Sequence, residues 1–438
     1  MSNNKVQPRI MPGFMELLPE DQIAFNRMFD TIRRVYERYG FLPLDTATIE
    51  LSEVLLAKAG GETEKQIYRF QKGDTDMALR FDLTVPLARY VAQHAGELAF
   101  PFKRYQMSKV FRGERPQKGR FREFYQCDID VIGVDSLDIV YDAEMPAVIY
   151  NVFKELAFGA FTIRMNNRKV LNGFFSALGY ADKIGDILRT IDKLEKIGRE
   201  AVEKELGEFG VAEADIAKIL SFLAIRGEND AVIEALRAQD VDNELYRAGV
   251  EELATVVAYL RRFGVEERAF IIDLTIARGL DYYTGTVFET MLNDYPSMGS
   301  ICSGGRYDSL AGYYTDQKLP GIGISIGLTR LFYQLKENGL VPPSQASLAR
   351  CLVIPMGEAQ MDAALAAATT IRGAGIPADV YYQSKGMKQK MKYAAKIGVP
   401  YAAIIGEDEA NAGTVMLKDM NTGEQRAVLV AELPDAVR

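Results

Sequence analysis

Polar and apolar side chains alternate strictly over residues 125–131, and this two-residue period predicts a β-strand. Successive side chains of a strand point to opposite faces, so Gln126, Asp128 and Asp130 share one face while apolar residues occupy the other. Aromatic and β-branched residues at 105–111 favour a second strand upstream. We therefore predict a long antiparallel hairpin with one polar and one apolar face.

The loop of this hairpin, near residues 116–119, lies within an unusual group of charges. Four arginines gather there beside carboxylates: Arg112, Arg115, Arg120 and Arg122, with Glu114 and Glu123. A hairpin on an ordinary surface has a similar composition, but its charges are usually scattered. Here the arginines lead into an aligned amide and two carboxylates, which suits a ligand with an anionic end and a cationic end.

Helical spacing dominates a later stretch, from about residue 172 to 263. Leucines and alanines recur there at helical intervals, and glycines interrupt the pattern. We predict a helical subdomain inserted into an α+β domain that spans residues 1–342. Its charged positions are typical of solvated helix faces, and the alternative is a surface that grips a partner.

The pattern changes again after a polar, proline-containing linker, which we assign to residues 343–349. Residues 350–438 then alternate between strand-like and helix-like segments: 351–355, 360–374, 378–382, 388–397, 401–405 and 414–419. Such alternation predicts a small α/β domain with a mostly parallel sheet.

Two further places combine polar side chains with a predicted junction between elements. Asp82 and Thr84 lie between a strand and a helix, where they either cap the helix or hold an ammonium group. Residues 321–327, GIGISIG, predict a strand that runs into a helix with Arg330 in its first turn. A helix start carries partial positive charge, so an arginine there is unfavourable by about 0.3–1 kcal/mol unless something anionic lies nearby.

Composition and charge exclude several classes of protein. The chain has 438 residues, which allows about three domains of ordinary size. Its three cysteines are widely separated and His94 is its only histidine, so a zinc site, a disulfide framework or a histidine-dependent triad is not expected. No signal peptide or membrane span is evident, which predicts a cytoplasmic protein without membrane contact.

The overall charge of −8 means that any nucleic-acid partner must meet local basic patches. One stripe of lysines in the last domain fits this description: Lys385, Lys388, Lys392 and Lys396. On statistics it is a solvated helix face, and as a face that contacts phosphates it would suit RNA.

Several long motifs resemble those of the class II aminoacyl-tRNA synthetases, and specifically the histidyl-tRNA synthetase family. FRGERPQKGRFREFYQ resembles motif 2 of the family and GIGISIGLTRL resembles motif 3. ARGLDYYTGTVFE and SGGRYD are similar to its two histidine-binding signatures, and AAIIGEDEANAGTVMLKDMNTGEQ to its anticodon-binding domain. One departure is Ala47, which stands where motif 1 usually carries a proline.

This resemblance implies a fold, an activity and partners. The fold is a catalytic α+β domain built on an antiparallel sheet, with a helical insertion and a carboxy-terminal α/β anticodon-binding domain. The activity is activation of L-histidine by ATP, followed by transfer to the terminal adenosine of tRNA(His). Mg²⁺ accompanies ATP without a dedicated side-chain motif, and the protein is a homodimer. The alternative within the family is the non-catalytic regulatory subunit of ATP phosphoribosyltransferase.

The resemblance also assigns roles to residues by motif position. Arg112 and Arg278 are expected to be catalytic. The residues implied to bind ATP are Arg112, Glu114, Arg120 and Arg330. Those implied to bind histidine are Asp82, Thr84, Gln126, Asp130, Arg278, Tyr282, Tyr283 and Tyr307. Within that set, Asp82, Thr84 and Gln126 correspond to the ammonium end, while Asp130, Tyr283 and Tyr307 correspond to the imidazole.

Overall fold

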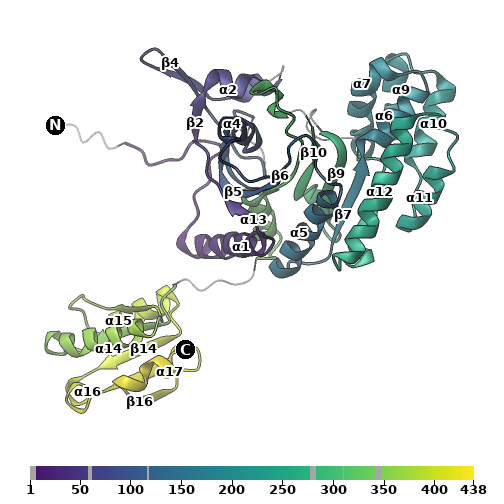
Figure 1. Ribbon diagram of the computed structural model, residues 1–438. Coiled ribbons are helices and arrows are strands. Elements are labelled where there is room, and N and C mark those ends of the chain that lie inside the picture. The colour runs from purple at the N-terminus through teal and green to yellow at the C-terminus, as the bar shows by residue number, and fades with distance from the viewer. Residues whose placement is uncertain (1–5, 58–61, 116–117, 277–282, 309, 342–346) are drawn as a thin grey trace. The chain divides into compact units, whose positions relative to one another are not determined.

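The computed structural model describes residues 6–57, 62–115, 118–276, 283–308, 310–341 and 347–438. The chain divides into two compact units, one made of residues 1–15 and 29–340 and the other of residues 16–28 and 341–438. Figure 1 labels many of the helices and strands of both units. None of the described helices combines the length and the apolar character that crossing a lipid bilayer requires. The domain boundaries expected from the sequence remain predictions.

An eight-stranded sheet forms the centre of the first unit. In spatial order its strands are β1 (Leu42–Pro43), β5 (Phe102–Phe111), β6 (Glu123–Ile132), β11 (Gly321–Gly327), β10 (Cys302–Tyr307), β9 (Tyr283–Leu292), β7 (Phe161–Asn167) and β8 (Phe270–Ile272). The pairs β1–β5 and β7–β8 are parallel, and every pair between them is antiparallel. This confirms the predicted α+β class on an antiparallel sheet.

The hairpin predicted from residue alternation is the longest strand pair of this sheet. Strands β5 and β6 pair in register from Phe102 with Ile132 to Phe111 with Glu123. The apolar face of β6 is covered by residues 29–38 of helix α1 (Pro19–Arg38), where buried Tyr36 donates a hydrogen bond of 2.9 Å to the carbonyl of Cys127. Because that face is used for packing, the other face of β6 is left to line a cavity.

Shorter elements complete the first unit around the sheet. Strands β2 (Ile49–Leu51), β4 (Thr75–Leu79) and β3 (Arg69–Lys72) form a separate three-stranded sheet. The described residues of this unit also form helices α2 (Ser52–Leu56), α3 (Glu62–Gln66), α4 (Thr84–His94), α5 (Val140–Leu156) and α13 (Leu328–Glu337). The predicted strand-to-helix junctions at residues 82–84 and 327–328 therefore both exist.

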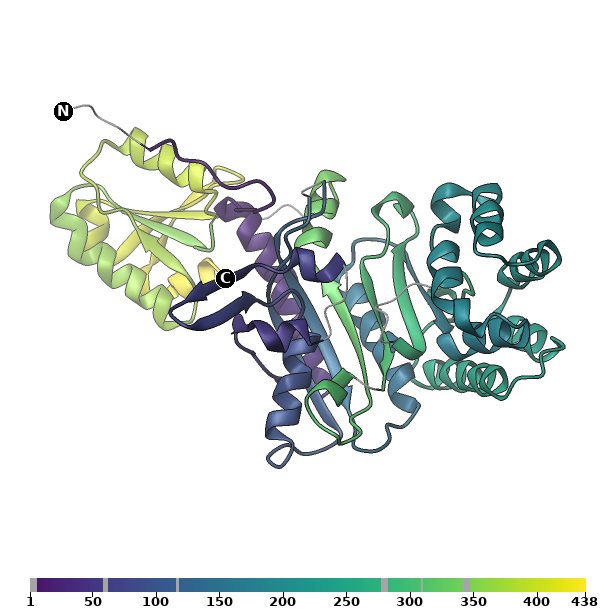
Figure 2. The ribbon, with the colours of Figure 1, turned by 90° about the horizontal axis from the view of Figure 1, so that it is seen from above.

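The helical segment predicted from leucine and alanine spacing lies beside β7. Its helices are α6 (Arg168–Ala177), α7 (Ile184–Ile191), α8 (Leu194–Ile197), α9 (Arg199–Glu208), α10 (Glu213–Leu223), α11 (Asn229–Arg237) and α12 (Glu244–Arg262). Figures 1 and 2 both show these teal helices at the β7 end of the eight-stranded sheet. A stacked pair of rings, Phe174 and Phe222 with centroids 4.0 Å apart, joins α6 to α10 inside this group.

The second unit contains a five-stranded sheet whose strands are β13 (Ala378–Val380), β12 (Cys351–Pro355), β14 (Tyr401–Ile405), β15 (Thr414–Asp419) and β16 (Gln425–Leu429), in that order. Helices α14 (Met361–Gly373), α15 (Met387–Ile397), α16 (Glu407–Ala412) and α17 (Leu433–Ala436) accompany it. The α/β class is confirmed.

The prediction of a mostly parallel sheet in this unit is wrong. Strand β12 runs parallel to β13 and β14, but the pairs β14–β15 and β15–β16 are antiparallel. Only residues 406–413 separate β14 from β15, and a parallel crossover needs a dozen residues or more. The sequence prediction also missed β16, because most of its side chains are exposed and it shows no run of apolar residues.

Candidate functional site

A cavity of about 610 Å³ opens over the polar face of the β5–β6 hairpin. Every described residue of the predicted site lines it: Asp82, Thr84, Arg112, Glu114, Arg120, Gln126, Asp130, Tyr283, Tyr307 and Arg330. Arg278 and Tyr282 lie outside the described residues. Side chains from five separate segments therefore meet at one place, as the sequence motifs require.

The floor of the cavity is a polar layer on adjacent strands. Register pairs Arg104 with Asp130 across β5 and β6, and Asp130 with Gly323 across β6 and β11. Asp130 is almost fully buried and has two partners: Arg104 Nη2 lies 2.6 Å from its Oδ2, and the Tyr307 hydroxyl donates to its Oδ1 at 2.8 Å. Burial raises the pKa of Asp130 to about 6, while the Arg104 charge and the Tyr307 hydrogen bond act in the opposite direction.

Glycines of β11 make room for this arrangement. A Cβ atom at Gly323 would lie 2.1 Å from Asp130 Oδ1, and one at Gly321 would lie 2.5 Å from the ring of Tyr307. The spacing of glycines in GIGISIG therefore has a steric cause: the strand passes directly against a carboxylate and a phenol.

Asp82, Thr84 and Gln126 lie at another part of the cavity lining. Asp82 accepts a hydrogen bond of 3.0 Å from the amide of Val85, so it does act as a helix cap. It nevertheless reaches the cavity, and burial raises its pKa. The amide oxygen of Gln126 is buried and has no hydrogen-bond partner among the described residues. An acceptor in this state is available to a donor such as an ammonium group.

Three arginines reach the same cavity from two directions. Arg112 donates to the carbonyl of Phe81 at 3.0 Å and stacks 5.1 Å from the Phe124 ring centroid, which fixes its side chain. Arg120 pairs with Glu114 at 3.1 Å, and Arg330 donates to the carbonyl of Met298 at 2.8 Å.

The positive charges of Arg330 and Arg120 oppose each other in the cavity lining. Partial burial of the Arg330 guanidinium and then the charge of Arg120 lower the pKa of Arg330, although part of its side chain stays accessible to solvent. A bound polyanion would relieve this repulsion, as expected for the unfavourable arginine at the start of α13.

Arginines elsewhere in the motifs serve a different purpose. Arg122 donates to the Glu114 carbonyl at 3.0 Å and does not line the cavity, and Arg115 is exposed and does not line it either.

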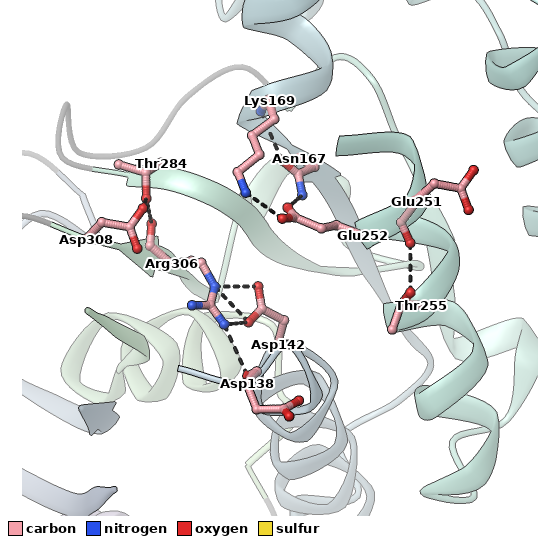
Figure 3. A network of polar contacts seen from close by, with 10 residues as sticks. All are labelled: Asp138, Asp142, Asn167, Lys169, Glu251, Glu252, Thr255, Thr284, Arg306 and Asp308. Atoms are coloured by element: carbon pink, nitrogen blue, oxygen red, sulfur yellow. Dashed lines mark hydrogen bonds and ion pairs between the residues drawn. The ribbon is translucent and has the colours of Figure 1, made fainter. Parts of the chain in front are cut away.

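Figure 3 shows Arg306, the neighbour of Tyr307, reaching towards α5. It pairs there with buried Asp142, at 3.0 Å from Nε to Oδ1, and donates to the Asp138 carbonyl at 3.2 Å. Arg306 therefore braces β10 against α5 and does not bind ligand in the cavity.

The cavity lining also includes residues to which the sequence motifs assign no role, among them Asp128, Ser325 and Glu289. Asp128 and Ser325 are paired in register on β6 and β11, Ser325 accepts a hydrogen bond of 2.8 Å from the Gln126 amide, and Glu289 lies on β9. Asp128 was detectable, because alternation already placed it between Gln126 and Asp130. Ser325 and Glu289 gave no such signal, since only strand register brings them to the site.

Comparison with known proteins agrees with this geometry. A family model described as histidyl-tRNA synthetase matches residues 13–331. The chain belongs to the histidyl-tRNA synthetase family. A second family model, described as an anticodon binding domain, matches residues 350–438.

Individual histidyl-tRNA synthetases are similar over nearly the whole chain. The histidine–tRNA ligase of Clostridium tetani is 57% identical over 433 residues, which covers 99% of this chain and 98% of that protein. The crystal structure of histidyl-tRNA synthetase from Nostoc sp. PCC 7120 has a TM-score of 0.92 at 42% identity and covers 99% of both chains.

A third structure is described as an ATP phosphoribosyltransferase regulatory subunit/histidyl-tRNA synthetase from Bacillus halodurans. Its TM-score is 0.75 at 20% identity, and the match covers 89% of this chain and 97% of that one. At this level of identity the likeness shows the shared fold alone.

Proposed function

We propose that the cavity activates L-histidine with ATP and then passes the histidyl group to the terminal adenosine of tRNA(His). The chain is an aminoacyl-tRNA ligase by family, and the proposal concerns which residues perform each step. One observation carries it: arginines from the β5–β6 hairpin and from α13 line the same cavity as the buried acid and phenol groups of β6, β9 and β10.

The arginines suit the triphosphate of ATP. By motif position Arg112 grips the α-phosphate, and Arg120 and Arg330 the outer phosphates, with Glu114 at the nucleotide. A guanidinium presents paired donors in a plane that matches phosphate oxygens. At 4 Å and an effective dielectric of 20, each such charge pair is worth about 4 kcal/mol before desolvation.

The polar floor suits histidine. Asp82, Thr84 and Gln126 receive the ammonium group, and Asp130, Tyr283 and Tyr307 read the imidazole; Tyr282, also in this signature, is assigned by motif alone. An amino acid without ring nitrogens would leave the buried Asp130 with fewer partners. Because unpaired buried polar groups cost about 1–3 kcal/mol, such amino acids bind more weakly.

The first chemical step needs no general base. A carboxylate oxygen of histidine attacks the α-phosphorus, the bond to the bridging oxygen breaks, and pyrophosphate leaves. Arg112 stabilises the charge that builds up on the α-phosphate oxygens. Arg278, by motif position, holds the histidine carboxylate near that phosphate.

Magnesium is compatible with the residues of the cavity. Within the described residues no cluster of three or more metal-ligating side chains exists, but the carboxylates of Glu114 and Glu289 both line the cavity. Mg²⁺ is commonly held by one or two carboxylates together with substrate phosphates, so these two residues would hold it. It would share the negative charge of the phosphates.

A pyrophosphate-exchange assay tests the proposal. The protein should exchange labelled pyrophosphate into ATP only when L-histidine is present and without tRNA, and it should then charge tRNA(His). The non-catalytic alternative, a regulatory subunit of ATP phosphoribosyltransferase, requires that no exchange occurs. The presence of Arg112, Arg120 and Arg330 around one cavity favours the enzyme.

We further propose that the protein works as a homodimer in the cytoplasm. Both proposals rest on the family resemblance, with the substitution at Ala47 in motif 1 as the position to examine. Sedimentation of the purified chain gives the subunit number directly, and a monomer at micromolar concentration would refute the dimer.

A further inference from the structure

A buried arginine contacts Asp130 but does not itself line the cavity. Arg104 on β5 is 0% exposed. Its Nη2 lies 2.6 Å from Asp130 Oδ2, and the same nitrogen donates to the carbonyl of Leu83 at 3.3 Å. Leu83 stands between Asp82 and Thr84, so one guanidinium touches both the Asp130 side chain and the segment with the proposed ammonium ligands.

Hydrogen bonding within the fold does not account for Arg104. Two of its nitrogens, Nε and Nη1, have no hydrogen-bond partner among the described residues. Arg80 is also buried, but its guanidinium nitrogens bond backbone carbonyls: it donates to the carbonyls of Lys109 at 2.9 Å and of Thr46 at 2.6 Å. Since unpaired buried donors destabilise a fold, Arg104 needs another reason to be there.

The surrounding charges supply that reason. The groups whose titration Arg104 influences come from three elements and the 82–84 segment: Tyr36 on α1, Asp128 and Asp130 on β6, Tyr307 on β10, and Asp82. Tyr283 on β9 acts on Tyr307 in addition. Burial raises the pKa of Asp128 to about 7 and of Asp130 to about 6, and the positive charge of Arg104 opposes both shifts. Arg104 thus acts on three buried carboxylates, and Arg112 acts on Asp82 more strongly than Arg104 does.

The two partners of Asp130 also fix its direction. Arg104 holds Oδ2 from β5, and Tyr307 holds Oδ1 from β10. A ligand that enters the cavity therefore meets a carboxylate whose rotation is already restricted, and this lowers the entropy lost on binding.

We propose that Arg104 is a positioning residue of the amino-acid pocket, which keeps Asp130 ionised and fixed and ties it to the segment that carries Asp82 and Thr84. The inference rests on the proposed function, because it takes Asp130 to be a histidine ligand. Arg104 itself acts through Asp130.

The test compares Arg104→Met and Arg104→Lys with wild type in histidine-dependent pyrophosphate exchange, from pH 5.5 to 9. Arg104→Met should raise the KM for histidine at least tenfold and leave the KM for ATP within about twofold. The acidic limb of kcat/KM for histidine should move to higher pH, because the carboxylates lose the cation that favours their ionised form. Arg104→Lys should recover part of both effects.

A double variant separates this electrostatic role from simple packing. Asp128→Asn removes one of the carboxylates that share the cation, so adding it to Arg104→Met should lower the raised KM at least threefold. Arg80→Met is the matched control: the same change at a buried arginine outside the cavity lining should lower thermal stability without moving the acidic limb.

Each outcome has one meaning. A wild type that shows no histidine-dependent exchange refutes the proposed function. If wild type exchanges, any one of three results refutes the role of Arg104 and leaves the proposed function standing. These results are an unmoved acidic limb in Arg104→Met, equal rises in the KM for histidine and the KM for ATP, and additive effects in the double variant. If Arg104→Met does not fold, Arg104→Lys decides: a KM for histidine and an acidic limb that both equal those of wild type would refute the role of Arg104.

Discussion

At Asp130, burial and hydrogen bonding act against each other. Burial favours the neutral acid, whereas Arg104 and the Tyr307 hydroxyl favour the carboxylate, and the result is a pKa of about 6. An ionised carboxylate at neutral pH accepts hydrogen bonds from a ring N–H, so under the proposed function the balance at this residue sets how well the pocket selects histidine. The Tyr307 hydroxyl is one of the two groups that favour the ionised form of Asp130, so its removal tests this balance directly.

We predict that Tyr307→Phe raises the KM for histidine about tenfold, because Asp130 loses a charge-assisted hydrogen bond worth roughly 1.5–3 kcal/mol. The KM for ATP should stay within about twofold, as measured by pyrophosphate exchange. Tyr36→Phe is the control, since its buried hydroxyl bonds the Cys127 carbonyl on the opposite face of β6. A similar rise in both variants would contradict a specific role for the Tyr307 hydroxyl.

At the scale of elements, β11 shows how the glycines of a strand shape the pocket that the strand helps to line. Gly323 lets the strand lie against Asp130, and Gly327 ends it at the start of α13 with open space around its Cβ position. Both are glycines of the same motif, but only one is required by a close contact.

We predict that Gly323→Ala abolishes measurable histidine-dependent exchange, because the new Cβ would lie 2.1 Å from Asp130 Oδ1 and displace it. Gly327→Ala should keep activity within about threefold of wild type, since nothing lies within 4 Å of its added Cβ. Circular dichroism of both variants checks that the fold is kept. Equal activity in the two would show that Asp130 tolerates displacement.

Helix α15 is the second element with a testable surface. Met387 and Met391 pack into the core of the second unit, whereas Lys388, Lys392 and Lys396 are exposed. Lysines placed in this way either keep the domain soluble or contact phosphates. The two roles can be distinguished by their effect on tRNA(His), because only lysines that contact phosphates would change its charging.

We predict that Lys388→Glu combined with Lys392→Glu lowers kcat/KM for tRNA(His) about tenfold or more and leaves pyrophosphate exchange unchanged. Loss of phosphate contacts should also flatten the salt dependence of charging. Arg426→Glu combined with Lys418→Glu, the same charge change on β15 and β16, is the control. Charging that falls equally in both double variants would assign the effect to net charge.

For the molecule as a whole, the buried carboxylates link the site to stability. Their pKa values are raised above the unfolded value of about 3.9, so the folded protein binds more protons between pH 4 and 7. Their contribution to the free energy of unfolding is therefore fully present below pH 4 and is lost as pH rises through 6 and 7. The buried carboxylates therefore lower the stability of the ligand-free protein at neutral pH.

We predict that Asp128→Asn raises the melting temperature of the ligand-free protein by a few degrees at pH 8 and changes it little at pH 5, because the pKa of Asp128 is about 7. Scanning calorimetry across this pH range measures the effect. Asp240→Asn, at an exposed carboxylate in the turn after α11, should leave the profile unchanged. Parallel profiles for wild type and Asp128→Asn would show that Asp128 does not titrate in this range.

Much of the fold and of the site follows from the sequence because the signals are local. Two-residue alternation places Gln126, Asp128 and Asp130 on one face whatever the rest of the chain does, and helical spacing likewise predicts residues 172–263 as helices. The family motifs add residue roles, which stay predictions until variants are measured.

What only the tertiary structure decided depends on register and on the length of connections. Arg306 and Arg330 look alike in the sequence, yet one pairs with Asp142 and the other lines the cavity. Arg104 contacts Asp130 because β5 and β6 pair in one register. Gly323 follows Asp130 by nearly two hundred residues in the chain and lies beside it because β11 pairs with β6. The mixed sheet of the second unit follows from a connection too short to cross over. Sequence periodicity determines which way a side chain faces, whereas strand register determines what it faces.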